Sequence, residues 1–180
     1  MQSQIIKGCN ELKGKHIQLR PLKESDLVFL NQWKNDESIY KYLGGGFIPV
    51  SYDQQKNWIS SLIDMTGNNK RFLILSPDQV PVGMIGLYGI NWIHRTCECG
   101  LFIGDSEARG KGYAFDAWCT LEHYAKCYLN LRKINLKVVS ENKGGFNLWK
   151  KCGFVQVGVL HEERFIDGKY CDVVLMEKFL

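Results

Sequence analysis

The sequence predicts a single α/β domain with a mixed, largely antiparallel sheet flanked by helices. Short alternating runs typical of strands stand among longer runs with helical spacing, and no repeat, linker or low-complexity tract divides the chain. The 180 residues, 45% of them hydrophobic and 12% aromatic, suffice for one sizeable core. We place this domain at residues 15–180, after a polar lead-in at residues 1–14.

The first part of the chain predicts one strand and two helices. Residues 17–20 alternate as a strand does and stop at Pro21. A helix is expected over residues 23–34, where Ser25 and Asp26 supply start signals. The triple glycine at 44–46 predicts a loop, and residues 51–65 predict a second helix. The apolar stripe of that second helix consists of Trp58, Ile59, Leu62 and Ile63.

The middle of the chain predicts strands at residues 72–75, 82–92 and 97–103, antiparallel because their connections are short. Residues 112–128 then carry apolar side chains along one side, which predicts a helix that packs on the sheet. A short acidic link and a basic, glycine-rich turn separate this helix from the strand before it.

The last part of the chain predicts a strand at residues 134–139 and a short helix at 144–151 that Gly153 ends. Two further strands follow at residues 155–160 and 170–179. The Asp167-Gly168 pair predicts the turn between them.

Composition excludes several classes of function. A formal charge of +4 is too small a surplus to indicate a nucleic-acid surface. Seven scattered cysteines favour a reduced protein over a disulfide framework. No apolar run approaches a membrane span, and the start of the chain lacks the apolar stretch of a signal peptide. We therefore expect a soluble, cytoplasmic protein without nucleic-acid or membrane partners.

The sequence also argues against a bound metal. Cys97 and Cys99 share one strand face without a second ligand pair at metal spacing, and the four histidines are dispersed. We expect no metal site.

The most informative segment is Arg109-Gly110-Lys111-Gly112, which stands between a predicted strand and a predicted helix. Its glycines let backbone N–H groups converge at the helix start, where the helix dipole also favours an anion. A phosphate or pyrophosphate would fit there. The segment matches neither the Walker loop, because Gly112 follows Lys111, nor the dinucleotide fingerprint, because Phe115 stands where glycine is needed.

With this loop the chain resembles the GCN5-related N-acetyltransferase (GNAT) family, and the resemblance covers residues 15–180. The segment from Arg109 to Ala114 is similar to the acetyl-CoA signature of that family, Arg/Gln-x-x-Gly-x-Gly/Ala. Residues 138–142 and 148–154 resemble its second signature, a strand with Asn, a short helix and Gly-Phe. Residues 19–22 with Asp26 resemble the opening of the Rim-type and spermidine-acetyltransferase branch. The resemblance implies the GNAT fold and transfer of acetyl from acetyl-CoA to an amine by direct attack.

The resemblance also implies which residues hold acetyl-CoA. Backbone amides of the loop would bind the pyrophosphate, and the strand before it would pair with the pantetheine amides and polarise the thioester carbonyl. Asn142 and Asn147 would line the channel near the sulfur, or else cap the backbone locally. Lys150 would reach the phosphates or face water. The implied acetyl-CoA residues are Leu101, Phe102, Ile103, Arg109, Gly110, Lys111, Gly112, Tyr113, Ala114, Asn142, Asn147, Trp149 and Lys150.

Glu98 is the candidate general base, because Cys97-Glu98-Cys99-Gly100 matches the Ala-Glu-Leu-Gly segment of the family. An amine of pKa ~10.4 is deprotonated only about one part in 2,500 at pH 7, which corresponds to roughly 4.6 kcal/mol. A lysine-like acceptor would thus gain strongly from a base, and an α-amine much less. The alternative is that Glu98 only orients the acceptor.

The general acid departs from the family pattern. Many relatives carry Tyr where this chain has Trp149, and an indole N–H is not a usable acid. A thiol of pKa ~8.5 can leave as thiolate at pH 7. We expect that a dedicated acid is absent or supplied elsewhere, and that Trp149 packs on the pantetheine.

The acceptor is expected between the helices of residues 23–65, the glycine loop at 44–46 and the hairpin near Asp167. Since this region lacks a carboxylate cluster, we favour a Rim-type acceptor, the N-terminal amine of a protein. The alternatives are a small-molecule amine (a nucleotide-linked amino sugar, a polyamine or an aminoglycoside) and a module that binds acetyl-CoA without turnover. The sequence leaves open whether the protein forms a homodimer.

Overall fold

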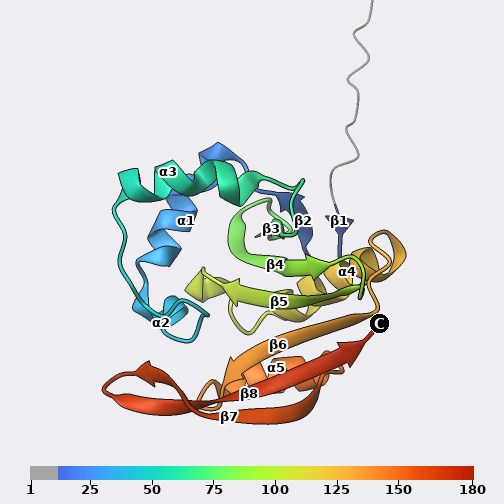
Figure 1. Ribbon diagram of the computed structural model, residues 1–180. Helices are drawn as coiled ribbons and strands as arrows, with labels where there is room; N and C mark the ends of the chain where they lie inside the picture. Colours follow the sequence, from blue (N-terminus) through green and yellow to red (C-terminus); the bar gives the residue numbers. More distant parts are fainter. Residues whose placement is uncertain (1–11) are drawn as a thin grey trace, which may run out of the picture.

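The computed structural model describes residues 12–180, which fold around one eight-stranded sheet (Figure 1). The strands are β1 (Leu12–Lys13), β2 (Gln18–Pro21), β3 (Lys70–Leu75), β4 (Pro81–Asn91), β5 (Thr96–Ile103), β6 (Lys133–Val139), β7 (Val155–Ile166) and β8 (Lys169–Phe179). The helices are α1 (Leu27–Lys34), α2 (Glu37–Tyr40), α3 (Tyr52–Ile63), α4 (Tyr113–Cys127) and α5 (Lys143–Lys151), with 3₁₀ turns η1 (Glu24–Asp26) and η2 (Ser106–Ala108). Of the expected lead-in, residues 1–11 lie outside the described residues, and Leu12–Lys13 pair with β2.

The sheet has the order β1-β2-β3-β4-β5-β6-β8-β7. Every neighbouring pair is antiparallel except β5 and β6, which are parallel. The parallel pair is possible because α4 forms the crossover between these two strands. The expected mixed, largely antiparallel α/β architecture is therefore confirmed.

The sheet opens between β5 and β6. These strands pair only at Thr96↔Lys133, Cys97↔Ile134 and Glu98↔Asn135. Beyond Glu98, β5 stays paired with β4 and β6 stays paired with β8, and Figure 1 shows the two ribbons separating toward α2. The result is a split sheet whose halves are held apart at one end.

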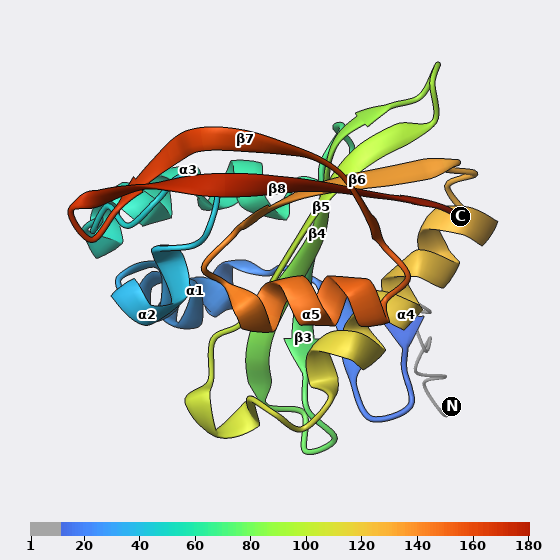
Figure 2. The ribbon, with the colours of Figure 1, turned by 90° about the horizontal axis from the view of Figure 1, so that it is seen from below.

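Helices cover both faces of the central strands (Figure 2). On one face, the buried side of α4 (Ala117, Trp118, Leu121) packs with Ile85 and Leu87 of β4. On the other face, α1, α2 and α3 enclose a second cluster against β3. The alternation of β3 and β4 between these two clusters explains why both strands read as nearly continuous apolar runs.

Three elements differ from the sequence prediction. The helix α2 was not predicted, because its four residues bury only Ile39 and are too short to show a period. Strand β7 continues to Ile166 instead of ending at residue 160, because a bulge interrupts its alternation. Trp58 was expected on the apolar face of α3 but is 43% exposed, and Gln55 is buried beside Ile59 instead. Among residues 12–180, no helix has the length and apolar character needed to cross a bilayer.

Candidate active site

A cavity of about 510 Å³ lies where β5 and β6 separate. Its wall combines both halves of the split sheet with the segment that follows α2, so it depends on residues distant in sequence. The wall consists of Tyr40, Tyr42, Leu43, Gly44, Gly45, Met84, Tyr88, Glu98, Cys99, Gly100, Leu101, Phe102, Lys137, Val138, Asn142, Trp149 and Arg164.

The β5 side of the cavity offers an open strand edge. Because pairing with β6 ends at Glu98, the edge of β5 that faces β6 has no strand partner over residues 99–103. Leu101 and Phe102 of this stretch lie in the cavity wall, and Ile103 follows them at the strand end. Backbone N–H and C=O groups on such an edge can still form hydrogen bonds, so an extended ligand with amide groups can pair with this edge as another strand would.

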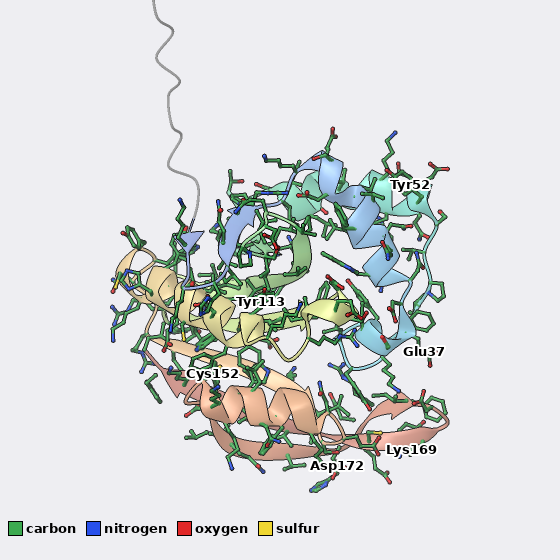
Figure 3. All side chains as sticks on the ribbon, turned by 180° about the vertical axis from the view of Figure 1, so that it is seen from behind. Glu37, Tyr52, Tyr113, Cys152, Lys169 and Asp172 are labelled. Carbon is green, nitrogen blue, oxygen red and sulfur yellow. The ribbon has the colours of Figure 1, made fainter. Side chains whose placement is uncertain are left out.

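The basic glycine loop lies at the end of β5, outside the cavity wall. Gly110 and Gly112 adopt φ of 76° and 82°, the left-handed region that favours glycine. Gly112 is the N-cap of α4, whose first turn begins with Tyr113 and Ala114, and it offers no side chain to the first-turn N–H groups (Figure 3, Tyr113). Arg109 Nε lies 3.4 Å from the carbonyl oxygen of Ile103, and both Arg109 and Lys111 are exposed. Backbone donors, helix dipole and two cations therefore meet where an anion can bind.

The α5 side contributes two of the four residues expected from the second signature. Asn142 lies in the cavity wall, and its Oδ1 also accepts the Gly145 N–H at 2.9 Å, so it is a helix cap as well. Trp149 lies in the wall but is only 6% exposed, since it packs edge-on against Trp118 and Phe154 at 5.6 and 5.2 Å. Asn147 and Lys150 are exposed on α5 and lie outside the wall.

Glu98 stands at the other end of the cavity, where the pairing of β5 and β6 stops. Its Oε1 lies 3.9 Å from Lys137 Nζ, a loose ion pair between partly exposed side chains. In the β4–β5 register Glu98 is directly opposite Tyr88, so both side chains project from the same face of the sheet. A carboxylate, an ammonium group and a phenol thus lie in one cavity wall.

The ring of Tyr88 lies across Gly86 and Gly100, which face each other on β4 and β5. A Cβ atom on Gly86 would lie 2.7 Å from Tyr88 Oη, and one on Gly100 would lie 3.2 Å from its Cε2. Burial raises the pKa of Tyr88 to about 12, so its phenol stays protonated at neutral pH. Burial also raises the pKa of the Cys99 thiol well above its ordinary value. Both groups are therefore neutral hydrogen-bond donors in this wall.

Sequence reasoning missed part of this wall. Five wall residues carry no local motif and come from α2, the segment after it, β4, β6 and β7: Tyr40, Tyr42, Tyr88, Lys137 and Arg164. A signal for Tyr88 existed in the glycines at positions 86 and 100, which leave space beside an aromatic residue. Among the described residues, no group of His, Cys, Asp and Glu side chains has the arrangement of a metal site.

The resemblance implied a strand that pairs with pantetheine and a glycine loop before a helix, and the structure has an open edge on β5 and a glycine loop before α4. Residues 16–155 match the acetyltransferase (GNAT) domain family. The chain belongs to the GNAT acetyltransferases. It is therefore an acetyl-CoA-dependent N-acetyltransferase, as the resemblance implied.

Several relatives place this GNAT enzyme near the spermidine-acetyltransferase branch. It is 34% identical to spermidine N(1)-acetyltransferase of Vibrio cholerae over 166 residues, which are 90% of this chain and 94% of the relative. A crystal structure of the V. cholerae spermidine N-acetyltransferase in complex with CoA and spermine superposes with a TM-score of 0.83 at 32% identity, covering 91% of this chain and 95% of that one. Identity to the ribosomal-protein-serine acetyltransferase of Escherichia coli is 25% over 119 residues, 66% of this chain and 65% of the relative.

Proposed function

We propose that this GNAT enzyme acetylates a primary amine of a small molecule, and that a linear polyamine of the spermidine type is the acceptor. The observation that carries the proposal is its similarity to spermidine acetyltransferases along nearly the whole chain. Similarity to the ribosomal-protein-serine acetyltransferase is lower and covers less of the chain. The relatives thus favour the small-molecule alternative over the protein N-terminal amine that the sequence led us to prefer.

The cavity wall supports an acceptor that carries an ammonium group on an alkyl chain. Tyr40, Tyr42 and Tyr88 contribute aromatic surface, and Glu98 contributes one carboxylate. Aromatic faces attract cations and pack well against methylene groups, and a carboxylate attracts the ammonium group directly.

The acetyl donor would occupy the gap between β5 and β6. In this proposal, the loop from Arg109 to Gly112 binds the pyrophosphate with its backbone N–H groups. The free edge of β5 at Leu101 and Phe102 pairs with the pantetheine arm. A backbone N–H of the same edge is then available for the oxyanion that develops on the thioester carbonyl.

In the reaction, the free amine attacks the thioester carbonyl carbon, a C–N bond forms and the C–S bond breaks. Glu98 takes one proton from the amine, directly or through water, which offsets part of the roughly 4.6 kcal/mol needed to deprotonate a lysine-like amine at pH 7. As the C–S bond breaks, the nitrogen releases its second proton to solvent, and CoA leaves as thiolate and takes up a proton from solvent, so that the amide and the free thiol of CoA are the products. Trp149 has no role in that step, because its ring is fixed in the core between Trp118 and Phe154.

A second acceptor class is favoured by the charge of the wall. Two cations, Lys137 and Arg164, accompany the single carboxylate of Glu98. A polycation is not favoured by such a balance, whereas an amine that also carries a phosphate or carboxylate is, as in a nucleotide-linked amino sugar.

The decisive experiment is release of CoA thiol from acetyl-CoA with a panel of amines. The panel comprises spermidine, spermine, an aminoglycoside, a nucleotide-linked amino sugar and a peptide with a free N-terminus. We expect the highest kcat/KM with a polyamine. Preference for the amino sugar would establish the second class, and preference for the peptide would restore the N-terminal acceptor.

The role of Glu98 is tested with the best acceptor. Glu98→Gln should lower kcat by about 10²-fold or more, the usual contribution of a general base, and leave the KM of acetyl-CoA unchanged. Glu24→Gln, which changes an exposed glutamate of η1 outside the cavity wall, is the matched control. An unchanged pH–rate profile in Glu98→Gln would exclude Glu98 as the base.

A further inference from the structure

The segment after α2, residues 41–45, bridges the open end of the split sheet. Tyr40, the last residue of α2, and Leu43 pack with the cluster formed by α1, α3 and β3, and the Tyr40 ring lies 5.8 Å from that of Phe102 on β5. Tyr42, which lies between Tyr40 and Leu43 in the sequence, packs with Val139 and Val173 of the other half of the sheet. The segment therefore contacts both halves at the point where β5 and β6 no longer pair.

Two polar contacts attach this segment to the β7–β8 hairpin. Arg164 Nη1 donates to the carbonyl oxygen of Leu43 at 2.7 Å, and Arg164 Nη2 lies 3.9 Å from the position that a Cβ of Gly44 would take. Lys41 Nζ forms an ion pair with Asp167 Oδ2 at 3.2 Å. Figure 3 shows the hairpin that carries Lys169 reaching toward the helix that carries Glu37. Of these contacts, only that of Arg164 lies inside the cavity wall.

A bulge in β7 directs Arg164 into this position. Leu160 pairs with Val173 and Arg164 pairs with Cys171, so three residues of β7 oppose Asp172 alone. Glu162 takes a φ of 51° within the bulge, and Asp172 Oδ1 accepts its N–H at 2.9 Å. Bulges bend a strand and re-aim the side chains that follow, and here the side chain that follows is Arg164.

We propose that Arg164 is the positioning residue for the acceptor. The bulge, held by Asp172, aims the guanidinium at Leu43, and this contact fixes residues 41–45 as the acceptor wall of the cavity. The contact between Arg164 and Leu43 includes no residue of the free β5 edge or of the loop at 109–112, so we expect the binding of acetyl-CoA not to depend on it. The expected rise in the KM of the acceptor rests on the proposed function, whereas the expected effect on the order of residues 41–45 does not.

The test compares two variants that act on the same contact from different places. Arg164→Met removes the donor, and Asp172→Ala removes the acceptor that holds the bulge without touching the cavity. Each should raise the KM of the best acceptor roughly 10- to 100-fold, the size expected for one hydrogen bond to a charged group, with the KM of acetyl-CoA unchanged. The double variant should be no worse than Arg164→Met alone, since both changes break one chain of contacts.

Two matched variants complete the design. Asp172→Asn keeps an oxygen for the Glu162 N–H and should restore a nearly normal acceptor KM. Arg132→Met removes an exposed arginine that precedes β6 and contacts the Phe179 ring, and it should change neither KM. Hydrogen exchange of residues 41–45 provides a readout without any acceptor, and it should accelerate in Arg164→Met and Asp172→Ala only.

The proposal is overturned if Asp172→Ala leaves both acceptor KM and exchange unchanged while Arg164→Met raises acceptor KM, because Arg164 would then contact the acceptor directly. Equal rises in the KM of acceptor and acetyl-CoA would also overturn it, since they would indicate a general structural role. Failure of every polyamine as acceptor would refute the proposed function but leave the exchange result to decide the role of Arg164.

Discussion

The conformation of Gly112 allows a quantitative test of the anion-binding loop. Gly112 has a φ of 82°, and a Cβ atom added there would meet no atom within 4 Å. Substitution therefore introduces backbone strain without a steric clash. An L-residue pays about 1–2 kcal/mol in the left-handed region, and Asn tolerates that region better than Ala.

We expect Gly112→Ala to lose this 1–2 kcal/mol either from stability or from acetyl-CoA binding. If the loop keeps its shape, the melting temperature falls by about 2–8 °C. If the loop relaxes, its N–H groups turn away from the pyrophosphate and the Kd of acetyl-CoA rises about 5- to 30-fold. Gly112→Asn should show a smaller combined effect, although Asn is the larger residue.

Differential scanning fluorimetry and calorimetric titration with acetyl-CoA measure the two parts separately. Gly67→Ala, a glycine with ordinary φ and a neighbour no closer than 3.9 Å, is the control and should change little. If Asn proves worse than Ala, size and not backbone conformation limits this position, and the reasoning fails.

Three further predictions follow from the same structure. Burial by itself would raise the pKa of Asp26, but two hydrogen bonds from Arg20 at 2.7 Å and one from the Lys23 N–H lower this pKa overall. The stability that Asp26 contributes is therefore fully present above the unfolded-state pKa of ~3.9, and it is lost as the pH falls below that value. Asp26→Asn should cost about 3 kcal/mol at pH 7 and flatten the acid limb of a plot of unfolding free energy against pH, and an unchanged limb would contradict the assignment. Because burial holds the Cys99 thiol protonated, no acetyl-cysteine should form with acetyl-CoA alone; a stable acetylated enzyme in the mass spectrum would replace direct attack by a two-step mechanism. Trp149→Tyr should lower the melting temperature by loosening the cluster with Trp118 and leave kcat within about threefold, whereas a large gain in kcat would show that thiolate protonation limits turnover.

The second family signature predicts residues near the cavity, but it does not predict which side of its helix faces the cavity. Asn142 and Trp149, two residues expected from this signature, lie in the cavity wall. The signature does not distinguish them from Asn147 and Lys150, which belong to the same short helix but are exposed and lie outside the cavity wall. The side of the nine-residue helix α5 that faces the gap depends on how α5 packs against α4. The motif does not specify this packing.

The glycine loop, the strand before it and most element boundaries follow from the sequence alone, because local conformational preferences and apolar periodicity determine them. The carboxylate at Glu98 is likewise found from its place in a strand motif. The acceptor wall does not follow from local sequence patterns. Tyr42, Tyr88, Lys137 and Arg164 stand in separate elements, and they meet only because β5 and β6 stop pairing after Glu98 and residues 41–45 cross the opening. Long-range packing brings these side chains together. No local sequence rule relates the bulge in β7 to a segment more than a hundred residues earlier in the chain.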